Sequence, residues 1–168
     1  MIPKKIETAM NEQVQKEFAS AYLYLSMSAW ADANSWPGMA AWLRAQWEEE
    51  IAHGMKFYSF ITDRGGRVEL KALEAPESKF SSPLDIFERA LDNEQKVTAS
   101  INDLYELAQN EKDFASYPLL DWFASEQVEE ESSVGQIVDD LKRVGNSGEA
   151  LLLIDHRLST RNTAAHDH

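Results

Sequence analysis

The chain has 168 residues, enough for one domain with a full hydrophobic core, and no cysteine, which excludes disulfides, iron–sulfur clusters, thiolate zinc sites and cysteine nucleophiles. Its 16 basic and 29 acidic residues give a net charge of −13, which disfavours nucleic acid and anionic membranes as partners and favours cations. The sequence starts without an apolar signal core and has no apolar run of membrane-spanning length, so we predict a soluble, cytoplasmic protein.

Two long helices are predicted in the first part of the chain. Apolar residues recur at helical spacing from about Pro3 to Asn34, and neither glycine nor a further proline interrupts them. Asn34 and Ser35 then offer capping side chains, and Pro37 suits the first turn of a second helix that ends near residue 64, before two glycines. Because the connection is short, these two helices are expected to be antiparallel neighbours.

Residues 65–82 have the pattern of an extended segment. Val68, Leu70 and Ala72 alternate with charged residues, and a proline and a serine cluster follow. A segment of this length can span about 60 Å when extended, far more than a tight turn needs. We therefore predict a crossover that runs the full length of a helical bundle and makes the second and third helices parallel.

The rest of the chain is predicted to form two more long helices and a short one. The third helix covers residues 83–110, where a serine cap and a first-turn proline mark its start, and the fourth runs from residue 113 or 117 to 144. A short apolar fifth helix follows at about 148–158, and residues 159–168 are predicted to form a flexible polar tail. The fold class is therefore all-α, a four-helix bundle with a long crossover between helices two and three and a short fifth helix.

A carboxylate beside an imidazole marks the middle of the second helix. Glu50 and His53 lie three residues apart and hence on one face, which is the geometry of half a metal site. Glu17 and Glu94 also fall near the middle of their helices, so the three acids are expected to meet at one height whichever direction each helix runs. The fourth helix repeats the three-residue spacing at that height, with Gln127 and Glu130.

The charges of this group predict two metal ions. The carboxylates of Glu17, Glu50, Glu94 and Glu130 would repel one another strongly inside a bundle, and their four negative charges balance two divalent cations. Oxygen ligands with a single imidazole suit iron or manganese, although zinc competes by intrinsic affinity. The fourth helix offers no histidine here, so the second metal is held by carboxylates alone and is expected to exchange more readily.

Three segments resemble those of the bacterial non-haem ferritins at that family's spacings: residues 22–30 (YLYLSMSAW), 48–53 (EEEIAH) and 125–131 (SEQVEEE). The resemblance covers nearly the whole length and implies a single ferritin-like domain over residues 1–168, with the four-helix bundle at about residues 3–144. It also implies iron storage, in which Fe(II) is oxidised by oxygen or hydrogen peroxide and kept as ferric mineral inside a homo-oligomeric cage of about 24 chains. No nucleic-acid or membrane partner is expected.

The same resemblance assigns roles to the central residues. It implies a ferroxidase centre in which Glu17, Glu50 and His53 hold one iron. Glu50, Glu94 and Glu130 would hold the second iron, with Glu50 bridging the two.

Further residues around the centre receive roles from this resemblance. Gln127 would lie beside the irons, placed to interact with bound oxygen species. Tyr24, seven residues after Glu17 and hence on the same helix face, would be a hydrogen-bonding or redox residue next to the centre. A third iron site is implied nearby, with the ligands Glu49, Glu126, Glu129 and Glu130.

Related classes of protein provide the alternatives. A di-iron oxidoreductase or peroxidase of rubrerythrin type is the main alternative to storage, although such proteins usually carry a cysteine-rich iron module and this chain has no cysteine. A DNA-protecting mini-ferritin places its site between subunits, whereas all four helices carry ligands here. Bacterioferritin binds haem through a methionine at about the position of Ala52 and has a fourth-helix histidine that is missing here, so no haem is expected.

Overall fold

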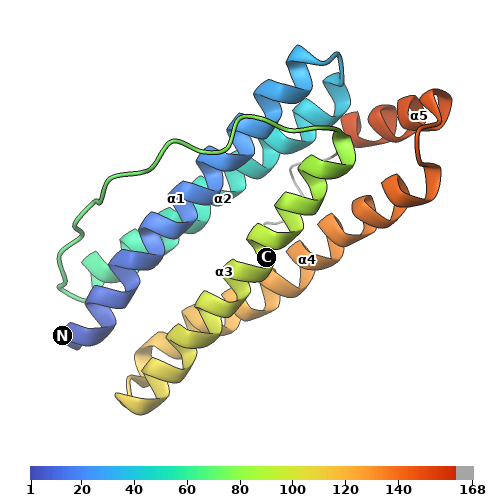
Figure 1. Cartoon of the computed structure of the whole chain (residues 1–168). Helices are drawn as coiled ribbons and strands as arrows, with labels where there is room; N and C mark the ends of the chain where they lie inside the picture. Colours follow the sequence, from blue (N-terminus) through green and yellow to red (C-terminus); the bar gives the residue numbers. More distant parts are fainter. Residues whose placement is uncertain (162–168) are drawn as a thin grey trace.

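The computed structural model describes residues 1–161, and in that range every regular element is a helix (Figure 1). This confirms the all-α prediction. The fourth helix begins at the later of its two predicted starts, because a separate turn precedes it. The elements are α1 (Lys4–Ala33), α2 (Pro37–Asp63), α3 (Pro83–Asn110), the 3-10 turn η1 (Phe114–Ser116), α4 (Tyr117–Val144) and α5 (Gly148–Ser159).

The connection between α2 and α3 is the long crossover that the sequence indicated. Figure 1 shows α1 and α2 as antiparallel neighbours, and a crossover that returns along α1 to the far end of the bundle. As a result α2 and α3 run in the same direction, and α4 runs back beside α3. Side chains of α1 hold the crossover backbone by hydrogen bonds of 2.7–2.9 Å. Asn11 donates to the Arg67 carbonyl and accepts from the Glu69 N–H, and Gln15 and Ser26 donate to the carbonyls of Ala72 and Glu77.

The starts of α3 and α2 are capped in two different ways. At α3 the cap is local, because Ser82 Oγ accepts from the backbone N–H of Asp85 at 3.1 Å and the Asp85 carboxylate accepts from the Ser81 N–H at 2.9 Å. At α2 no such local side-chain cap is present, and Asn34 instead closes the end of α1 by donating to the Trp30 carbonyl. The first turn of α2 is capped from α5, as described below.

The short helix α5 lies across the end of the bundle against α2 and α4 (Figure 1). Its buried Asp155 accepts hydrogen bonds from the backbone N–H groups of Gly38 and Met39, at 3.1 and 2.8 Å. A carboxylate at a helix N-terminus satisfies free donors and interacts favourably with the helix dipole. These two hydrogen bonds hold α5 at the start of α2. The burial of Ile154 and Leu158 also holds it against the bundle.

The chain after α5 is described as far as Arg161. Thr160 bonds back to the Arg157 carbonyl, and the half-buried Arg161 forms two hydrogen bonds to the Glu49 carboxylate, at 2.9 and 3.0 Å. These two residues are therefore held against the bundle. The rest of the predicted flexible tail, residues 162–168, lies outside the described residues.

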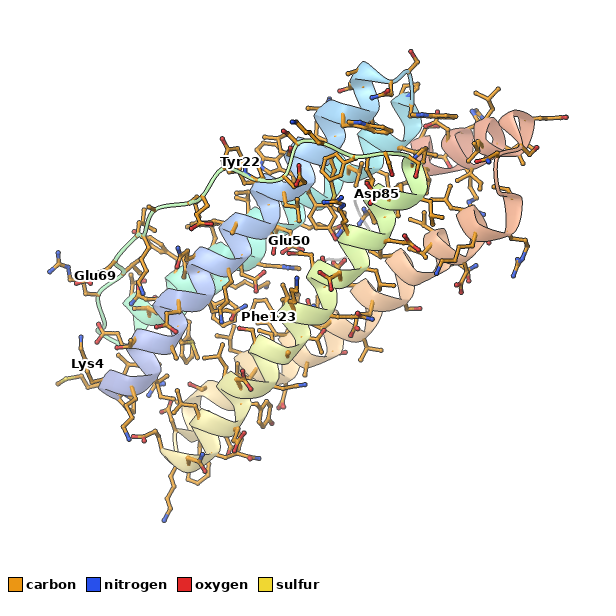
Figure 2. All side chains as sticks on the ribbon, viewed as in Figure 1. Lys4, Tyr22, Glu50, Glu69, Asp85 and Phe123 are labelled. Atoms are coloured by element: carbon orange, nitrogen blue, oxygen red, sulfur yellow. The ribbon has the colours of Figure 1, made fainter. Side chains whose placement is uncertain are left out.

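Two apolar clusters fill the bundle, one toward each end. On every long helix the residues of one cluster are separated from those of the other by the polar residues at mid-height. On α2, for example, Leu43 belongs to one cluster and Phe57 to the other, with Glu50 between them, and Figure 2 places Glu50 at the middle of the bundle. The packing of both clusters holds this polar layer in place.

Candidate metal centre

Eight polar side chains from the four long helices form a layer at the middle of the bundle. None of them is more than 8% exposed. Such burial is costly for polar and charged groups unless partners compensate it. The layer consists of Glu17 from α1, Gln46, Glu50 and His53 from α2, Glu94 from α3, and Glu126, Gln127 and Glu130 from α4.

Within this layer the structure brings together both sets of three residues that the family resemblance assigned to the two irons. Glu17, Glu50 and His53 each offer a ligand atom, and these atoms lie within 4.8 Å of one another. The same spacing holds for Glu50, Glu94 and Glu130. Because Glu50 belongs to both groups, the two are adjacent positions in one centre.

Oxygen atoms without donors show where cations would fit. Both carboxylate oxygens of Glu50, the Oε2 atom of Glu17 and the Oε1 atom of Glu130 are buried, and they have no hydrogen-bond partner while all the carboxyl groups are ionised. The Glu17 and Glu50 carboxyl groups lie close enough to share a proton when one is protonated. Hard oxygen donors of this kind fit iron, and Glu50, with two such atoms, has the donor set of a bridging ligand.

The burial of these acids has a large effect on their protonation. Burial raises the pKa of Glu17 from 4.5 to about 7. Burial, and then repulsion from Glu94, raises the pKa of Glu50 and of Glu130 well above the ordinary value. Without metal the centre therefore holds protons, which divalent cations would displace on binding.

Glu94 differs from the other three acids because both of its oxygens accept hydrogen bonds. The Tyr24 hydroxyl donates to Oε1 at 2.6 Å, and Gln127 Nε2 donates to Oε2 at 3.1 Å. Gln127 also contacts Thr98 Oγ1 at 3.2 Å. Burial raises the pKa of Glu94, and these two bonds favour its ionised form. Tyr24 and Gln127 thus each donate a hydrogen bond to the Glu94 carboxylate, one to each oxygen.

His53 lies between two carboxylates of the layer, those of Glu50 and Glu126. Its Nδ1 atom is 3.7 Å from Glu50 Oε1, and its Nε2 atom is 3.9 Å from Glu126 Oε1. The rings of Trp122 and Phe123 contact it edge-on, with centroids 5.5 and 5.6 Å away. These contacts fix the plane of the imidazole, so that its two nitrogens are directed at two different carboxylates.

The four acids implied as a third site are only partly brought together. His53, Glu126 and Glu130 offer ligand atoms within 4.8 Å of one another, a group that adds the histidine and lacks Glu49 and Glu129. Glu49 is half-buried and bound to Arg161, and Glu129 is exposed. The third site in its implied form stays a prediction.

Two glutamines that bond to ligands of the layer, Gln13 next to it and Gln46 within it, were not predicted from the sequence. Gln13 Nε2 donates to Glu17 Oε1 at 2.8 Å, and Gln46 Nε2 donates to Glu130 Oε2 at 2.9 Å. Both are almost fully buried. The available signal was their position, since each lies four residues before a predicted ligand, Glu17 or Glu50, and therefore on the same helix face.

A four-helix bundle with buried carboxylates and a histidine at mid-height defines the ferritin-like class of proteins. The family model described as "Ferritin-like domain" matches residues 7–144 of the chain. The chain belongs to the ferritin family, and iron storage is the function of that family. Among the described residues, no helix combines the length and the apolar character that crossing a membrane requires.

The relatives agree with this assignment over nearly the full length. A bacterial non-heme ferritin of Staphylococcus aureus (strain MRSA252) is 39% identical over 161 residues, covering 96% of this chain and 97% of the relative. One from Staphylococcus epidermidis is 40% identical over 162 residues, covering 96% and 98%. The open-pore ferritin of the archaeon Archaeoglobus fulgidus is 46% identical with a TM-score of 0.94, covering 96% of this chain and 98% of that one. These similarities confirm the resemblance that the sequence motifs indicated.

Proposed function

We propose that the chain oxidises Fe(II) at the centre formed by its four long helices and passes the Fe(III) to a mineral stored inside a cage of about 24 copies. The observation that carries the proposal is that several buried carboxylate oxygens of the layer have no hydrogen-bond donor. Among the four adjacent carboxylates, Glu50 has two oxygens without a hydrogen-bond donor, and Glu17 and Glu130 have one each. Unpaired buried acceptors are costly, and two cations would satisfy them.

The proposed ligands divide between two unequal positions. Glu17 and His53 would hold one Fe(II) with Glu50, and Glu94 and Glu130 would hold the other with Glu50. The second position has no nitrogen ligand, so we expect it to release its ion more easily. Gln127, whose Nε2 atom is 3.1 Å from Glu94 Oε2, would lie beside this second position, where its amide would bind an oxygen species.

The electron balance of the proposed reaction is simple. Two Fe(II) ions give two electrons, and O₂ that takes them with two protons becomes hydrogen peroxide. Hydrogen peroxide that takes two electrons and two protons becomes two waters. Oxidation raises the charge of the two ions from four to six, while the four carboxylates supply only four negative charges. The excess positive charge favours departure of the product into the store.

A variant in the shared ligand set tests the site. Glu130→Ala removes one acid from the second position, and rapid Fe(II) oxidation in stopped flow should fall by on the order of tenfold or more. Glu48→Ala is the matched control, because Glu48 is an exposed glutamate on α2 only two residues from Glu50. Oxidation by Glu130→Ala at the speed of this control would contradict the proposed ligand set.

A stoichiometric measurement separates storage from an oxidoreductase of rubrerythrin type. An oxidoreductase keeps its metals, so uptake would stop at two irons per chain. A storage protein should take up far more than two under air, and the ferric product should remain with the protein through gel filtration. Uptake that stops at two, or product that precipitates as in a protein-free control, would favour the oxidoreductase.

A further inference from the structure

A chain of three hydrogen bonds joins the outer surface of α1 and α3 to one of the proposed iron ligands. Lys16 Nζ donates to Ser100 Oγ at 2.8 Å, and Ser100 Oγ donates to Gln13 Oε1 at 2.6 Å. Gln13 Nε2 then donates to Glu17 Oε1 at 2.8 Å. The chain thus begins on an exposed ammonium group and ends on a fully buried carboxylate.

The chemistry of the groups fixes the direction of every bond. An ammonium group has only donors, so the Ser100 oxygen must accept from Lys16, and the single Ser100 proton is then free to point to Gln13. This assigns the Gln13 carbonyl oxygen to Ser100 and its NH₂ group to Glu17. All three donors therefore point from the surface toward the carboxylate, the arrangement in which each bond polarises and strengthens the next.

Burial makes the inner part of the chain rigid. Gln13 is 1% exposed and Ser100 is 8% exposed, so water competes little for their bonds. The outer end lies where a groove of about 710 Å³ and a smaller hollow of about 170 Å³ meet, since Lys16 and Ser100 line both. Of these three hydrogen bonds, the one that Lys16 makes is thus the most open to exchange with water or other partners.

The two carboxylate oxygens of Glu17 therefore differ in their bonding. Oε1 is occupied by Gln13, whereas Oε2 is buried and accepts from no N–H group. A proton shared with the neighbouring Glu50 carboxyl group would be displaced by a bound cation. We propose that Lys16, Ser100 and Gln13 form a positioning chain that holds Glu17 in one orientation and presents Oε2 alone to the cation at the histidine-containing position. This rests on the proposed function, because it assumes that Glu17 binds a cation there.

Binding of a redox-inactive cation tests the positioning chain apart from catalysis. In metal-free protein titrated with Co²⁺, Gln13→Leu should weaken binding at the histidine-containing position by about tenfold, the size of effect seen for partners of metal ligands. The Co²⁺ absorption spectrum should also change, because a freed Glu17 can bind through both oxygens. Ser100→Ala should act in the same direction, and Ser100→Thr, which keeps the hydroxyl, should restore the wild-type affinity and spectrum.

The lysine end offers a test that cannot be confused with misfolding, because Lys16 is exposed. Lys16→Met should weaken Co²⁺ binding measurably in the wild-type background but not when Gln13 is already leucine, since the connection is then broken and only the through-space effect of the Lys16 charge on Glu17 is lost. Lys96→Met is the matched control, because Lys96 lines the same groove but pairs with Asp92. Equal affinities and spectra for wild type, Ser100→Ala and Lys16→Met would overturn the positioning chain. Failure of the wild-type protein to bind two Co²⁺ per chain would instead count against the proposed function itself.

Discussion

The four central carboxylates have different environments although they lie in one layer. Glu50 has two oxygens without donors, Glu17 and Glu130 have one each, and both oxygens of Glu94 are hydrogen-bonded. Gln13 and Gln46 account for part of this difference by occupying one oxygen each on Glu17 and Glu130. The amides, which carry no charge, thereby determine which oxygens remain for cations.

The raised pKa of Glu17, about 7 against 4.5, predicts how the metal-free protein responds to pH. Between these values the folded protein binds more protons than the unfolded chain, so its stability falls as pH rises from about 4.5 to 7. Glu17→Gln removes this group, and the variant should gain up to about 3 kcal/mol on wild type between pH 5 and pH 8, at 1.36 kcal/mol per pKa unit. Melting temperatures in the presence of a chelator measure the difference.

Glu106→Gln, at an exposed position on α3, is the control for that experiment and should melt like wild type at both pH values. If Glu17→Gln shows the same pH dependence as this control, then Glu17 ionises normally in the folded protein. The assignment of a protonated acid cluster to the metal-free state would then be wrong.

At the scale of the helices, local signals in the sequence predicted the elements well. The start of α3 was predictable because Ser82 and Asp85 cap it from within the same few residues. The cap of α2 was not, because Asp155 lies more than a hundred residues away and only folding brings it there. The same distinction applies to the site, where mid-helix acids were predictable, whereas the bond from Gln46 on α2 to Glu130 on α4 depends on tertiary packing.

The contact between α5 and α2 leaves no space at Gly38. A Cβ atom added there would lie 1.8 Å from the Asp155 carbonyl oxygen, so α5 must move or α2 must lose its cap. Gly38→Ala should therefore lower the melting temperature. Gly135→Ala is the matched control, because a Cβ atom at that position on α4 meets nothing within 4 Å and the change should stabilise the helix by roughly 0.5–1 kcal/mol. Equal melting temperatures for both variants would show that α5 does not depend on close contact at Gly38.

At the scale of the whole molecule, the apolar surface of α5 is a feature that the packing of a single chain does not explain. Residues 151–154 are all apolar, so this helix has apolar side chains on more than one side. Ile154 is buried against the bundle, whereas Leu152 and Leu153 are 61% and 66% exposed. Two adjacent exposed leucines on a short helix are expected to be covered by another copy of the chain, and the proposed cage requires several such self-interfaces.

Leu153→Lys tests whether this surface is part of the assembly. Because the side chain is exposed in the isolated chain, a lysine there should leave the helical content nearly unchanged, but it places a charge where the proposed interface would exclude water. Sedimentation velocity should then show a shift from particles of about 24 chains to smaller species. Ser159→Lys adds the same charge at an exposed polar position of the same helix, and it should still assemble. A full-sized particle for Leu153→Lys would mean that α5 does not join subunits through this surface, and a wild-type protein that sediments as a monomer would refute the cage altogether.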